Sequence, residues 1–494
     1  MSDLALGIDL GTSGAKAIIA EPSVHGGERI LARASRAVPV SSPRPGWSEQ
    51  HPDLWRDTID ECLVELAAQH RALMGRVGGI GLSGQMLGAV LIDRSDRPVR
   101  PAILWNDQRS LRECDLLLER VPDIGWRTNG VPDPGLTAPK LLWLARHEPD
   151  AIDRADLLLL PKDQVRLWLT GERVSEPSDA GGTMLMECAT GAWSAELCEA
   201  AGWSLDRLPP TVASWERAGT LRDALAERWS LPRGIPVAAG AGDNMACSLG
   251  VGVARPGRAA ITIGTSAVVC APSAAFCPAP DDAMLTAAHA APSAFLSMAV
   301  VMSATASLDW VARLTGATVE ELASEIDAWL DPTSMREAPT CLPALSGVRT
   351  PHNRPGVGGA IEGLSHRTSR AALGYAVMEG IACQIRECVR AQARLGLEPE
   401  EYVAVGGGAT NPTWLTLIAT LLDRPVRRPA HGPDAAALGA ARLARLAADP
   451  SLEPGTVLGL PAAIDGTFDP KPEWSEPLGE RWSNYENLTG YVTR

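Results

Sequence analysis

The sequence lacks the features of a membrane or secreted protein. None of its segments approaches the ~20 consecutive apolar residues that a membrane-spanning helix needs. Its beginning, MSDLALGIDL, has no basic region of the kind that opens a signal peptide. Phenylalanine (3) and tyrosine (4) are also scarce, which we attribute to coding bias and not to function. These absences predict a cytoplasmic protein with no membrane partner.

The ten cysteines are scattered along the chain, with no C-x-x-C pair and no histidine nearby at metal-ligand spacing. The closest two, Cys383 and Cys388, fit small buried side chains on a helix. We therefore predict reduced cysteines and no metal site built from them.

Acidic residues outnumber basic ones. The chain has 59 Asp and Glu against 45 Lys and Arg, a formal net charge of −14. Because binding of nucleic acid requires a basic face, this balance argues against a nucleic-acid partner. It says little about small anions, since a few backbone amides can hold a nucleotide on an acidic protein.

The composition is that of a globular protein, with 45% hydrophobic and 21% charged residues and no low-complexity block. A chain of 494 residues is too long for one hydrophobic core. We therefore expect two domains of ordinary size.

The stretch 4–20, LALGIDLGTSGAKAIIA, predicts a strand that ends at Asp9, a turn over 11–14 and a second strand from Ala15. Glycines allow positive φ and close backbone approach, so a phosphate can bind the N–H groups of such a turn. Asp9 stands where a Mg²⁺ that bridges nucleotide phosphates would need a carboxylate or a carboxylate-held water. Taken alone, the stretch also fits a plain β-hairpin with an ordinary Asp near its turn.

An internal repeat strengthens the first interpretation. Residues 259–271, AAITIGTSAVVCA, have the same order of apolar strand, Gly-Thr-Ser and apolar strand. Self-similarity of two halves predicts two related domains. Two such hairpins facing each other would form a cleft with a phosphate loop on either wall, unless the two Gly-Thr-Ser turns are alike by chance.

A third stretch, 235–252, places a carboxylate after a glycine turn. An apolar strand runs into residues 240–242, and Asp243 and Asn244 then begin an apolar helix. A carboxylate held rigidly at the end of a strand is suited to act as general base for an incoming hydroxyl. The alternative is that Asp243 only caps its helix.

Polar residues also follow the strand predicted at 77–82, where Ser83 and Gln85 stand among apolar neighbours. Ligands of α/β sheets gather at such strand ends. A plain turn with a capping Ser is an equally good interpretation.

Asn106, Asp107 and Arg109 follow a short strand predicted at 102–105. Grouped in one turn, they could hydrogen-bond a polyol. They could equally begin the helix predicted at 111–119.

A glycine triplet, 406–408, stands between a strand predicted at 402–405 and a helix predicted at 414–422. It would let a flat base or a phosphate approach the backbone. As a lone motif it is only moderately specific.

The rest of the chain alternates strands with helices. We predict 175–183 to be a polar loop, with Asp179 available for structure or substrate, and 449–472 to be a loop rich in proline and glycine. A short helix near 477–488 would end the chain. Further predicted segments are strands at 28–40, 89–93 and 295–302, and helices at 54–74, 140–147, 164–169, 303–314, 370–396 and 435–445.

Taken together, these stretches resemble the FGGY family of carbohydrate kinases. The matching segments, in chain order, are 8–18, 45–55, 82–86, 100–109, 160–172, 178–184, 240–244, 261–266, 346–352, 406–411 and 437–444. They run across most of the chain, so the resemblance is far more specific than any single glycine-rich turn. Within the family they look most like members that convert D-xylulose to D-xylulose 5-phosphate.

The resemblance implies an α/β fold of two actin-like (ribonuclease H-like) domains with a central nucleotide and sugar cleft. Residues 1–252 would form the sugar-binding domain with the first phosphate loop, and residues 253–494 the nucleotide-binding domain with a C-terminal tail. ATP and Mg²⁺ are the implied cofactors, and a small-molecule sugar is the implied partner. Because dimers are common in such families, a homodimer is the implied assembly.

The resemblance also assigns roles to residues. Asp243 resembles the base toward the sugar hydroxyl, and Asp9 the acid near Mg²⁺, directly or through water. The implied substrate-binding residues are Gln85, Met86, Leu87, Trp105, Asn106, Asp107, Asp243 and Asn244. The implied nucleotide-binding residues are Gly11, Thr12, Ser13, Lys16, Gly264, Thr265, Gly407, Gly408, Ala409 and Asn411.

Two positions depart from the members that act on D-xylulose. Those members typically have Gln-Met-His where this chain has Gln85-Met86-Leu87, and Ser-Gly-Glu-Arg-Thr-Pro where it has SGVRTP at 346–351. A hydrogen-bonding side chain missing from the sugar site leaves a substrate hydroxyl unpaired, which costs roughly 1–3 kcal/mol. The departures leave the reaction class in place and the identity of the sugar open.

Three alternatives follow. The first is a kinase of the same family for ribulose, L-xylulose or a sugar alcohol. The second, an actin- or chaperone-type ATPase, shares the two phosphate loops but has no need of Asp243 together with Gln85, Asn106 and Asp107. The third, a non-catalytic sugar-binding regulator, has no need of both Asp9 and Asp243.

Overall fold

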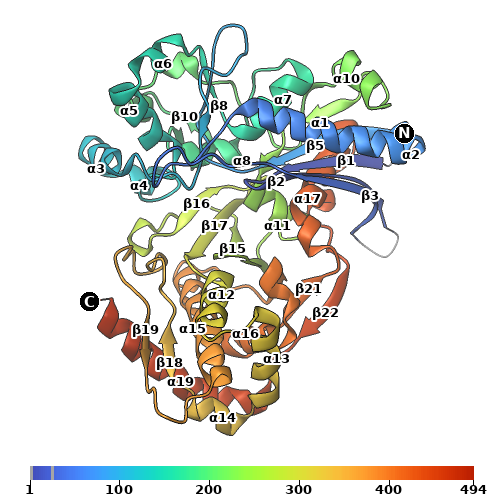
Figure 1. The fold of residues 1–494 in the computed structure, drawn as a ribbon. Helices are drawn as coiled ribbons and strands as arrows, with labels where there is room; N and C mark the ends of the chain where they lie inside the picture. Colours follow the sequence, from blue (N-terminus) through green and yellow to red (C-terminus); the bar gives the residue numbers. More distant parts are fainter. Residues whose placement is uncertain (1–3, 24–26, 494) are drawn as a thin grey trace.

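The computed structural model describes residues 4–23 and 27–493. Residues 1–3 and 494, which begin and end the two predicted domains, lie outside the described residues. The chain forms two lobes, one above the other in Figure 1, each built around a mixed β-sheet with helices. Among the described helices, none combines the length and the apolar character that crossing a bilayer requires.

The sheet of the upper lobe has the strand order β11-β12-β5-β1-β2-β3, and β13 pairs with the end of β5. β2 is antiparallel to both β1 and β3, whereas β5 is parallel to β1 and to β12. The bounds are β1 Leu4–Leu10, β2 Gly14–Pro22, β3 Glu28–Ala37, β5 Val77–Gly84, β11 Arg217–Thr220, β12 Pro236–Ala238 and β13 Ala241–Gly242.

The sheet of the lower lobe has the order β16-β17-β15-β14-β20-β21-β22. β15 is antiparallel to β14 and β17, and β20 is parallel to β14 and β21. The bounds are β14 Arg258–Ile263, β15 Ala267–Ser273, β16 Leu285–Ala288, β17 Phe295–Val301, β20 Glu401–Val405, β21 Val426–Pro429 and β22 Ile464–Phe468.

The two sheets repeat one pattern. In both, a strand–turn–strand hairpin carries the Gly-Thr-Ser turn, its first strand pairs in parallel with a strand from later in the chain, and its second pairs with a third antiparallel strand. The internal repeat that the sequence predicts between 4–20 and 259–271 is therefore confirmed, and so is the two-domain α/β fold.

Helices and short strands surround the sheets (Figure 1). In the first half of the chain the helices are α1 Pro52–Gln69, α2 Arg71–Met74, α3 Leu111–Arg120, α4 Ile124–Arg127, α5 Thr137–His147, α6 Pro149–Arg154, α7 Pro161–Thr170, α8 Pro177–Ala180, α9 Ala195–Ala200, α10 Asp223–Arg228 and α11 Asp243–Gly250. In the second half they are α12 Thr305–Leu314, α13 Val319–Trp329, α14 Pro332–Glu337, α15 Arg370–Ala393, α16 Pro412–Leu422, α17 Ala435–Ala448, α18 Pro454–Leu458 and α19 Pro472–Val492. The short strands are β4 Glu49–Gln50, β6 Val90–Ile92, β7 Ala102–Ile103, β8 Leu157–Leu159, β9 Met186–Glu187, β10 Ala192–Trp193, β18 Thr340–Leu342 and β19 Ala360–Glu362.

Three sequence predictions about elements are wrong. The segment 175–183 is not a polar loop: it forms α8 and a 3₁₀ turn at Gly181–Thr183, because the buried Glu176 carboxylate accepts the first N–H groups of α8. The segment 449–472 holds α18 and the edge strand β22. The last helix is not short, because Trp474, Leu478, Trp482 and Tyr485 pack into the lower lobe, which outweighs the helix-breaking Pro477.

Helix α17 comes from the second half of the chain but packs on the upper sheet (Figure 1). Three glycines of β1 and β5 face it. A Cβ on Gly7 or Gly81 would overlap a backbone carbonyl oxygen of α17, and a Cβ on Gly79 would lie 2.6 Å from the carbonyl oxygen of Ala444. The helix backbone therefore rests directly on the strand backbones, with no side chain between them.

The same helix crosses α11 at equally close range. A Cβ on Gly439 of α17 would overlap the carbonyl oxygen of Ala246, and a Cβ on Gly250 of α11 would overlap that of Ala435. Beside this crossing, the buried Arg442 donates from Nε to Glu28 Oε1 at 2.8 Å and from Nη2 to Oε2 at 2.7 Å. The position of α11, and of Asp243 at its start, therefore depends on this packing.

Replacing Gly439 by Ala tests this dependence. We expect Gly439→Ala to destabilise the protein by ~1–3 kcal/mol, because the new methyl group displaces one of the two helix backbones. The measurement is the midpoint of urea unfolding, followed by circular dichroism.

The matched control is Gly479→Ala in α19, where no described atom beyond the neighbouring backbone of the same helix lies within 4 Å of the new Cβ. It should stabilise the protein by ~0.5–1 kcal/mol, since glycine is costly inside a helix. Equal midpoints for the two variants would contradict the close contact.

Candidate active site

Two carboxylates meet at one edge of the upper sheet. Asp9 lies near the end of β1 and pairs in register with Ser83 of β5, whose Oγ donates to Asp9 Oδ1 at 2.8 Å. On the other side of β5, Ala241 of β13 pairs with Ser83, and Asp243 begins α11 two residues later. The topology thus brings together residues that are more than two hundred positions apart in sequence.

Burial and mutual repulsion shift the pKa values of this pair. Burial raises the pKa of Asp9 above its usual value, against the opposing effects of the Ser83 hydrogen bond and the Lys16 charge. Burial, and then the charge of Asp9, raise the pKa of Asp243 to about 7. Asp243 Oδ1 accepts from the backbone N–H of Asn244 at 2.7 Å and from its side-chain amide at 3.1 Å. A carboxylate poised near neutral pH is suited to take a proton from a hydroxyl.

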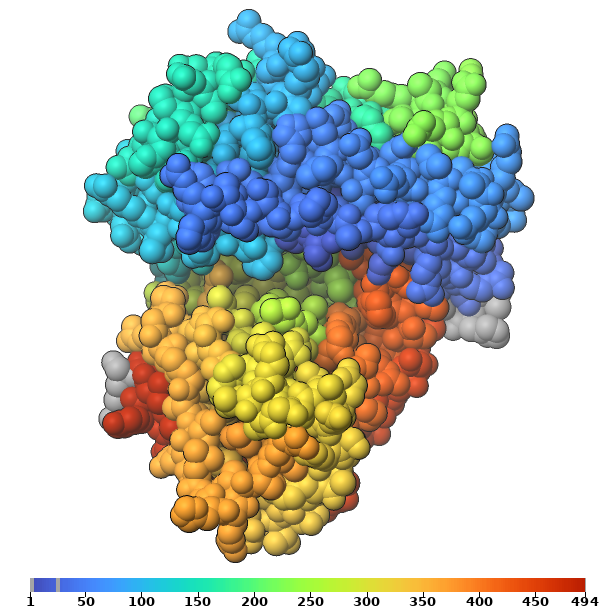
Figure 2. All heavy atoms as spheres, in the orientation of Figure 1, coloured from blue at the N-terminus to red at the C-terminus, as the bar shows by residue number. Residues whose placement is uncertain are grey.

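Helix α11 contacts β5 and β13 of the upper sheet and also reaches the second hairpin. The Cys247 thiol hydrogen-bonds Thr262 of β14, and burial together with the charges of Asp9 and Asp243 raises its pKa to about 12. The carboxylates therefore lie where the two lobes meet, and Figure 2 shows the surface hollowed between the blue upper lobe and the yellow and orange lower lobe.

The first glycine turn is tight, and hydrogen bonds hold it in place. The N–H of Gly11 donates to the carbonyl of Gly14 at 2.9 Å. The Thr12 hydroxyl accepts from Trp105 Nε1 at 2.8 Å, and Ser13 is exposed. The turn and Asp9 line a recess of about 450 Å³, so a phosphate can reach it.

Lys16 has a partner within the chain. Its Nζ lies 2.9 Å from Asp434 Oδ1 and also donates to the carbonyl of Pro433, just before α17. This ion pair links the first hairpin to the second half of the chain. The contact of Lys16 with a nucleotide stays a prediction, because a phosphate would have to share the ammonium with Asp434.

The second hairpin turn is joined to helix α12. The N–H of Thr305 donates to the carbonyl of Gly264 at 2.9 Å, and that of Ala304 to the carbonyl of Thr265 at 2.7 Å. The Thr265 side chain remains exposed. The turn is thus fixed against the start of α12 while the Thr265 side chain stays open to solvent, so its contact with a nucleotide stays a prediction.

The glycine triplet borders a cavity of about 430 Å³ in the lower lobe. Gly407, Gly408 and Asn411 contribute to its wall, and Asn411 also caps α16 by accepting from the N–H of Trp414 at 2.9 Å. Gly408 packs closely, since a Cβ there would overlap the Ile263 side chain. Ala409 is buried and is not among the residues that line this cavity, so its contact with a nucleotide stays a prediction.

Sequence reasoning missed the rest of this cavity. Its apolar wall comes from α12, α13 and α15, whose residues follow ordinary amphipathic patterns. They are Leu308, Val319, Leu322, Ala323, Ile326 and Met378. An apolar wall facing backbone amides suits an adenine base.

The segment after β5 lines the upper wall of the junction. Gln85 is buried, and its Nε2 donates to Gln50 Oε1 at 2.8 Å. Met86 packs against the turn before Asp243, where a Cβ on Gly242 would lie 2.7 Å from Met86 Sδ. Leu87 is partly exposed and has φ of 71°, which is unusual for a leucine.

Asp107 is held by partners within the chain, so its contact with a sugar stays a prediction. Asp107 is fully buried, and its carboxylate is held by Arg109 at 2.7 and 2.8 Å and by the N–H of Ser48 at 2.6 Å. This ion pair shapes the turn. The alternative, that these residues begin the helix, is wrong, because α3 begins at Leu111 with Ser110 at its N-cap position. Trp105 and Asn106 are exposed beside Asp107, so their contacts with sugar stay predictions.

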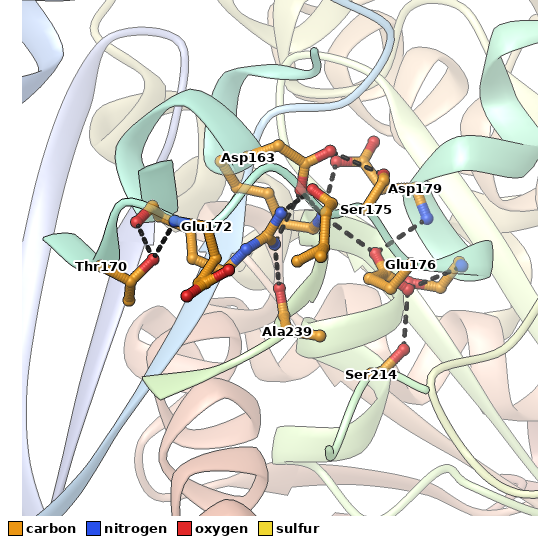
Figure 3. A network of polar contacts seen from close by, with 12 residues as sticks. Asp163, Thr170, Glu172, Ser175, Glu176, Asp179, Ser214 and Ala239 are labelled. Atoms are coloured by element: carbon orange, nitrogen blue, oxygen red, sulfur yellow. Dashed lines mark hydrogen bonds and ion pairs between the residues drawn. The ribbon is translucent and has the colours of Figure 1, made fainter. Parts of the chain in front are cut away.

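A buried ion cluster, which the sequence analysis did not anticipate, supports the strand before Asp243 (Figure 3). Lys162 Nζ lies 2.7 Å from Asp163, 3.1 Å from Glu176 and 3.4 Å from Asp179. Arg166 donates to the carbonyl of Ala239 at 2.6 Å. Asp179 is therefore buried in this cluster, and burial raises its pKa well above its usual value. One feature of the sequence could have indicated this cluster: charged residues stand within the otherwise apolar segment LPKDQVRLW.

The carboxylate beside the first glycine turn fits a Mg²⁺ ion that binds together with a nucleotide. In the described part of the chain, no group of three or more His, Cys, Asp or Glu residues could hold a metal ion. Mg²⁺ commonly takes one or two carboxylates and completes its shell with phosphate oxygens and water. Asp9 can supply such a carboxylate beside the first glycine turn.

Comparisons with known proteins agree with this geometry. Residues 4–250 match the FGGY family of carbohydrate kinases, N-terminal domain, and residues 259–448 match its C-terminal domain. Xylulose kinase of Escherichia coli is 39% identical over 445 residues, 90% of each chain, and that of Klebsiella pneumoniae is 39% identical over 461 residues, 92% of each. A solved structure described as a xyloylose kinase from Brucella ovis has a TM-score of 0.94 and 40% identity and covers 99% of both chains.

Removing the charge of Asp9 tests the coupling of the two carboxylates. In Asp9→Asn we expect the pKa of Asp243 to fall below 7, because one of the two causes that raise it is gone. A ¹³C NMR titration of the carboxyl carbons, without nucleotide, measures this.

Asp423→Asn is the control, because Asp423 is exposed at the end of α16. It should leave the Asp243 titration unchanged. An unchanged pKa in Asp9→Asn as well would mean that the two carboxylates do not interact.

Proposed function

Since this chain belongs to the FGGY family of carbohydrate kinases, we propose that it transfers the γ-phosphoryl group of ATP to the terminal hydroxyl of D-xylulose. The observation that carries the proposal is the pairing of Asp9 and Asp243 where the two lobes meet. The sugar is taken from the xylulose kinases to which the chain is similar. The sugar would bind within 1–252, and the nucleotide chiefly within 253–494.

Asp243 acts as the base in this proposal. As the terminal hydroxyl oxygen bonds to the γ-phosphorus, its proton passes to the Asp243 carboxylate, the bond from phosphorus to the β-phosphate oxygen breaks, and ADP leaves. The two donors from Asn244 orient the carboxylate. Phosphoryl transfer needs little covalent chemistry from the protein, so positioning and charge neutralisation carry most of the catalysis.

Asp9 would hold Mg²⁺, directly or through water. When bound, the ion neutralises charge on the β- and γ-phosphates. Gly11, Thr12 and Ser13 would receive phosphate oxygens on one side, and Gly264 and Thr265 on the other. The adenine would occupy the cavity beside Gly407 and Asn411 in the lower lobe.

Contacts between the lobes would exclude water during transfer. Asp133 of the upper lobe lies 3.5 Å from Arg349 of the lower lobe. A Cβ on Gly130 would lie 2.8 Å from the carbonyl oxygen of Met284, so this loop also meets the lower lobe. Exclusion of water limits wasteful hydrolysis of ATP.

One observation favours a second candidate function, phosphorylation of another ketose or polyol such as ribulose, L-xylulose or a sugar alcohol. Leu87 stands where the resemblance implies an imidazole.

Family membership argues against the actin- or chaperone-type ATPase. We propose in addition that the protein is cytoplasmic and forms a homodimer. The mass of the protein in solution tests the dimer.

Loss of the base is the first test. Asp243→Asn should lower kcat by ~10²–10⁴, because general base catalysis typically contributes that much, while ATP binding changes little. A coupled assay of ADP release and a titration with ATP measure the two quantities. In the unaltered protein, kcat/KM should fall as the pH drops below about 7, since protonated Asp243 accepts no proton.

The control is Asp423→Asn, which should keep both quantities normal. Near-normal kcat in Asp243→Asn would remove this residue from the mechanism.

A substrate panel tests the sugar. We expect D-xylulose to give the highest kcat/KM among D-xylulose, D-ribulose, L-xylulose and sugar alcohols, measured by ADP release. Preference for another member of the panel would establish the second candidate. ADP release that does not depend on any sugar would contradict the kinase proposal.

A further inference from the structure

A buried amide without a partner lies beside Leu87. Asn129 is 1% exposed, and no donor among residues 4–23 and 27–493 hydrogen-bonds its Oδ1. Leaving a buried acceptor unpaired is costly, because the oxygen loses the hydrogen bond that water would give it. Nearly all buried polar groups in proteins have a partner, so an exception needs an explanation, and a missing ligand or water is one.

The neighbours of Asn129 place it at the sugar side of the junction. A Cβ built on Gly182 would lie 3.8 Å from Asn129 Nδ2 and 3.6 Å from Met86 Cε, and would overlap Leu87 Cδ2. The same end of the Met86 side chain also reaches Gly242, beside Asp243, where a built Cβ would lie 2.7 Å from Sδ and 2.9 Å from Cε. Asn129, Leu87 and Met86 are therefore neighbours around Gly182, and we call these three side chains the amide wall. Met86 connects it to the turn before Asp243.

The backbone around Asn129 is fixed on both sides. The Thr128 hydroxyl donates to the carbonyl of Ile124 at 2.7 Å, and the N–H of Cys188 donates to the carbonyl of Arg127 at 2.9 Å. Gly130, with φ of 118°, packs against Met284 of the lower lobe. The backbone that carries the amide is thus held in place before any ligand arrives, which favours selective recognition of a hydroxyl.

Leu87 is also held, but it offers no hydrogen bond. Its carbonyl accepts from Thr137 Oγ1 at 3.0 Å and from Lys140 Nζ at 2.9 Å, and these two bonds stabilise its left-handed conformation. Lys140 is buried, and burial lowers its pKa to about 7. The side chain that this backbone presents is apolar, so a sugar hydroxyl that faces it needs a partner from another residue.

A second orphaned oxygen nearby has a different explanation. Gln85 Oε1 also has no partner in the described chain. Its amide nitrogen, however, belongs to a network in which Gln50 accepts from Gln85 and Trp55 and donates to the carbonyl of Thr12. That network supports the first glycine turn, so Gln85 points to the phosphate side and not to the amide wall.

We infer that Asn129 is a specificity-determining residue, whose side-chain oxygen accepts a hydrogen bond from a sugar hydroxyl that packs against Leu87. It supplies the hydrogen bond that the leucine cannot. The inference rests on the proposed function and deepens it, because it names the residue that selects among ketoses and polyols. A site built to bond a hydroxyl discriminates strongly against analogues that lack it.

The test combines Asn129→Ala with deoxy analogues of the preferred sugar, each lacking one hydroxyl. We expect kcat/KM for the full sugar to fall about 10- to 100-fold, in keeping with a lost hydrogen bond in an enclosed site. For one analogue, the one without the hydroxyl that Asn129 binds, the same substitution should change kcat/KM less than about twofold. A purely structural role would lower kcat/KM for the full sugar and every analogue alike.

A second variant gives an independent check. Histidine tolerates the left-handed region better than leucine does, so Leu87→His should fold and restore a hydrogen-bonding group to the amide wall. In that background Asn129→Ala should cost less than in the parent chain. An equal cost in both backgrounds would overturn the inference.

The outcomes separate this inference from the proposed function. Sugar-dependent ADP release by the parent chain, with equal losses for all analogues in Asn129→Ala, would overturn the inference and leave the kinase in place. If the parent chain releases no ADP with any sugar, the proposed function fails. In that case calorimetry measures the affinity of the same sugars for the parent chain and for Asn129→Ala. The inference is then decided by whether the substitution weakens binding of the full sugar more than binding of one deoxy analogue.

Discussion

The direct contact between helix α17 and the backbones of β1 and β5 is the constraint on which the rest of the structure depends. Glycines at positions 7, 79 and 81 let the backbones meet there, and Gly439 and Gly250 do the same where α17 crosses α11. A helix from the second half of the chain is thereby fixed to the sheet of the first half. Because interiors are close-packed, such a contact has no room to slide. The lobes therefore join through α11 and α17, and the start of α11 carries Asp243.

That geometry explains the electrostatics of the junction. Asp9 and Asp243 come from opposite sides of β5 and are enclosed together, so each charge opposes the other. A cation and the phosphates of a nucleotide would relieve the repulsion when they bind. The buried cluster around Lys162 holds the strand before Asp243 by charge pairing, and Arg166 reaches the carbonyl of Ala239. Breaking one member of such a cluster leaves an uncompensated buried charge, which is strongly destabilising.

Catalysis and sugar selection use different parts of the upper lobe. The carboxylates stand at the strand ends, where the reacting oxygen and phosphorus meet, whereas the amide wall of Asn129, Leu87 and Met86 lies to one side. A change at the amide wall can alter which hydroxyls are bonded without moving Asp243. This separation accounts for a chain that keeps both carboxylates of its family while it departs from the family pattern at Leu87.

The sequence by itself determined the two hairpins, their repetition, most of the helices and strands, and the candidate carboxylates, because those features are local: a glycine turn after an apolar strand, and a period of two or 3.6. Only the tertiary structure decided that the Asp107 carboxylate pairs with Arg109 and that Asp179 belongs to an ion cluster. It also decided that residues 464–468 form an edge strand and that α12, α13 and α15 line a cavity. It also decided the place of Asn129, which no motif marks. Each of these depends on partners far away in the chain, and a pairing between distant residues leaves no periodic trace in either segment.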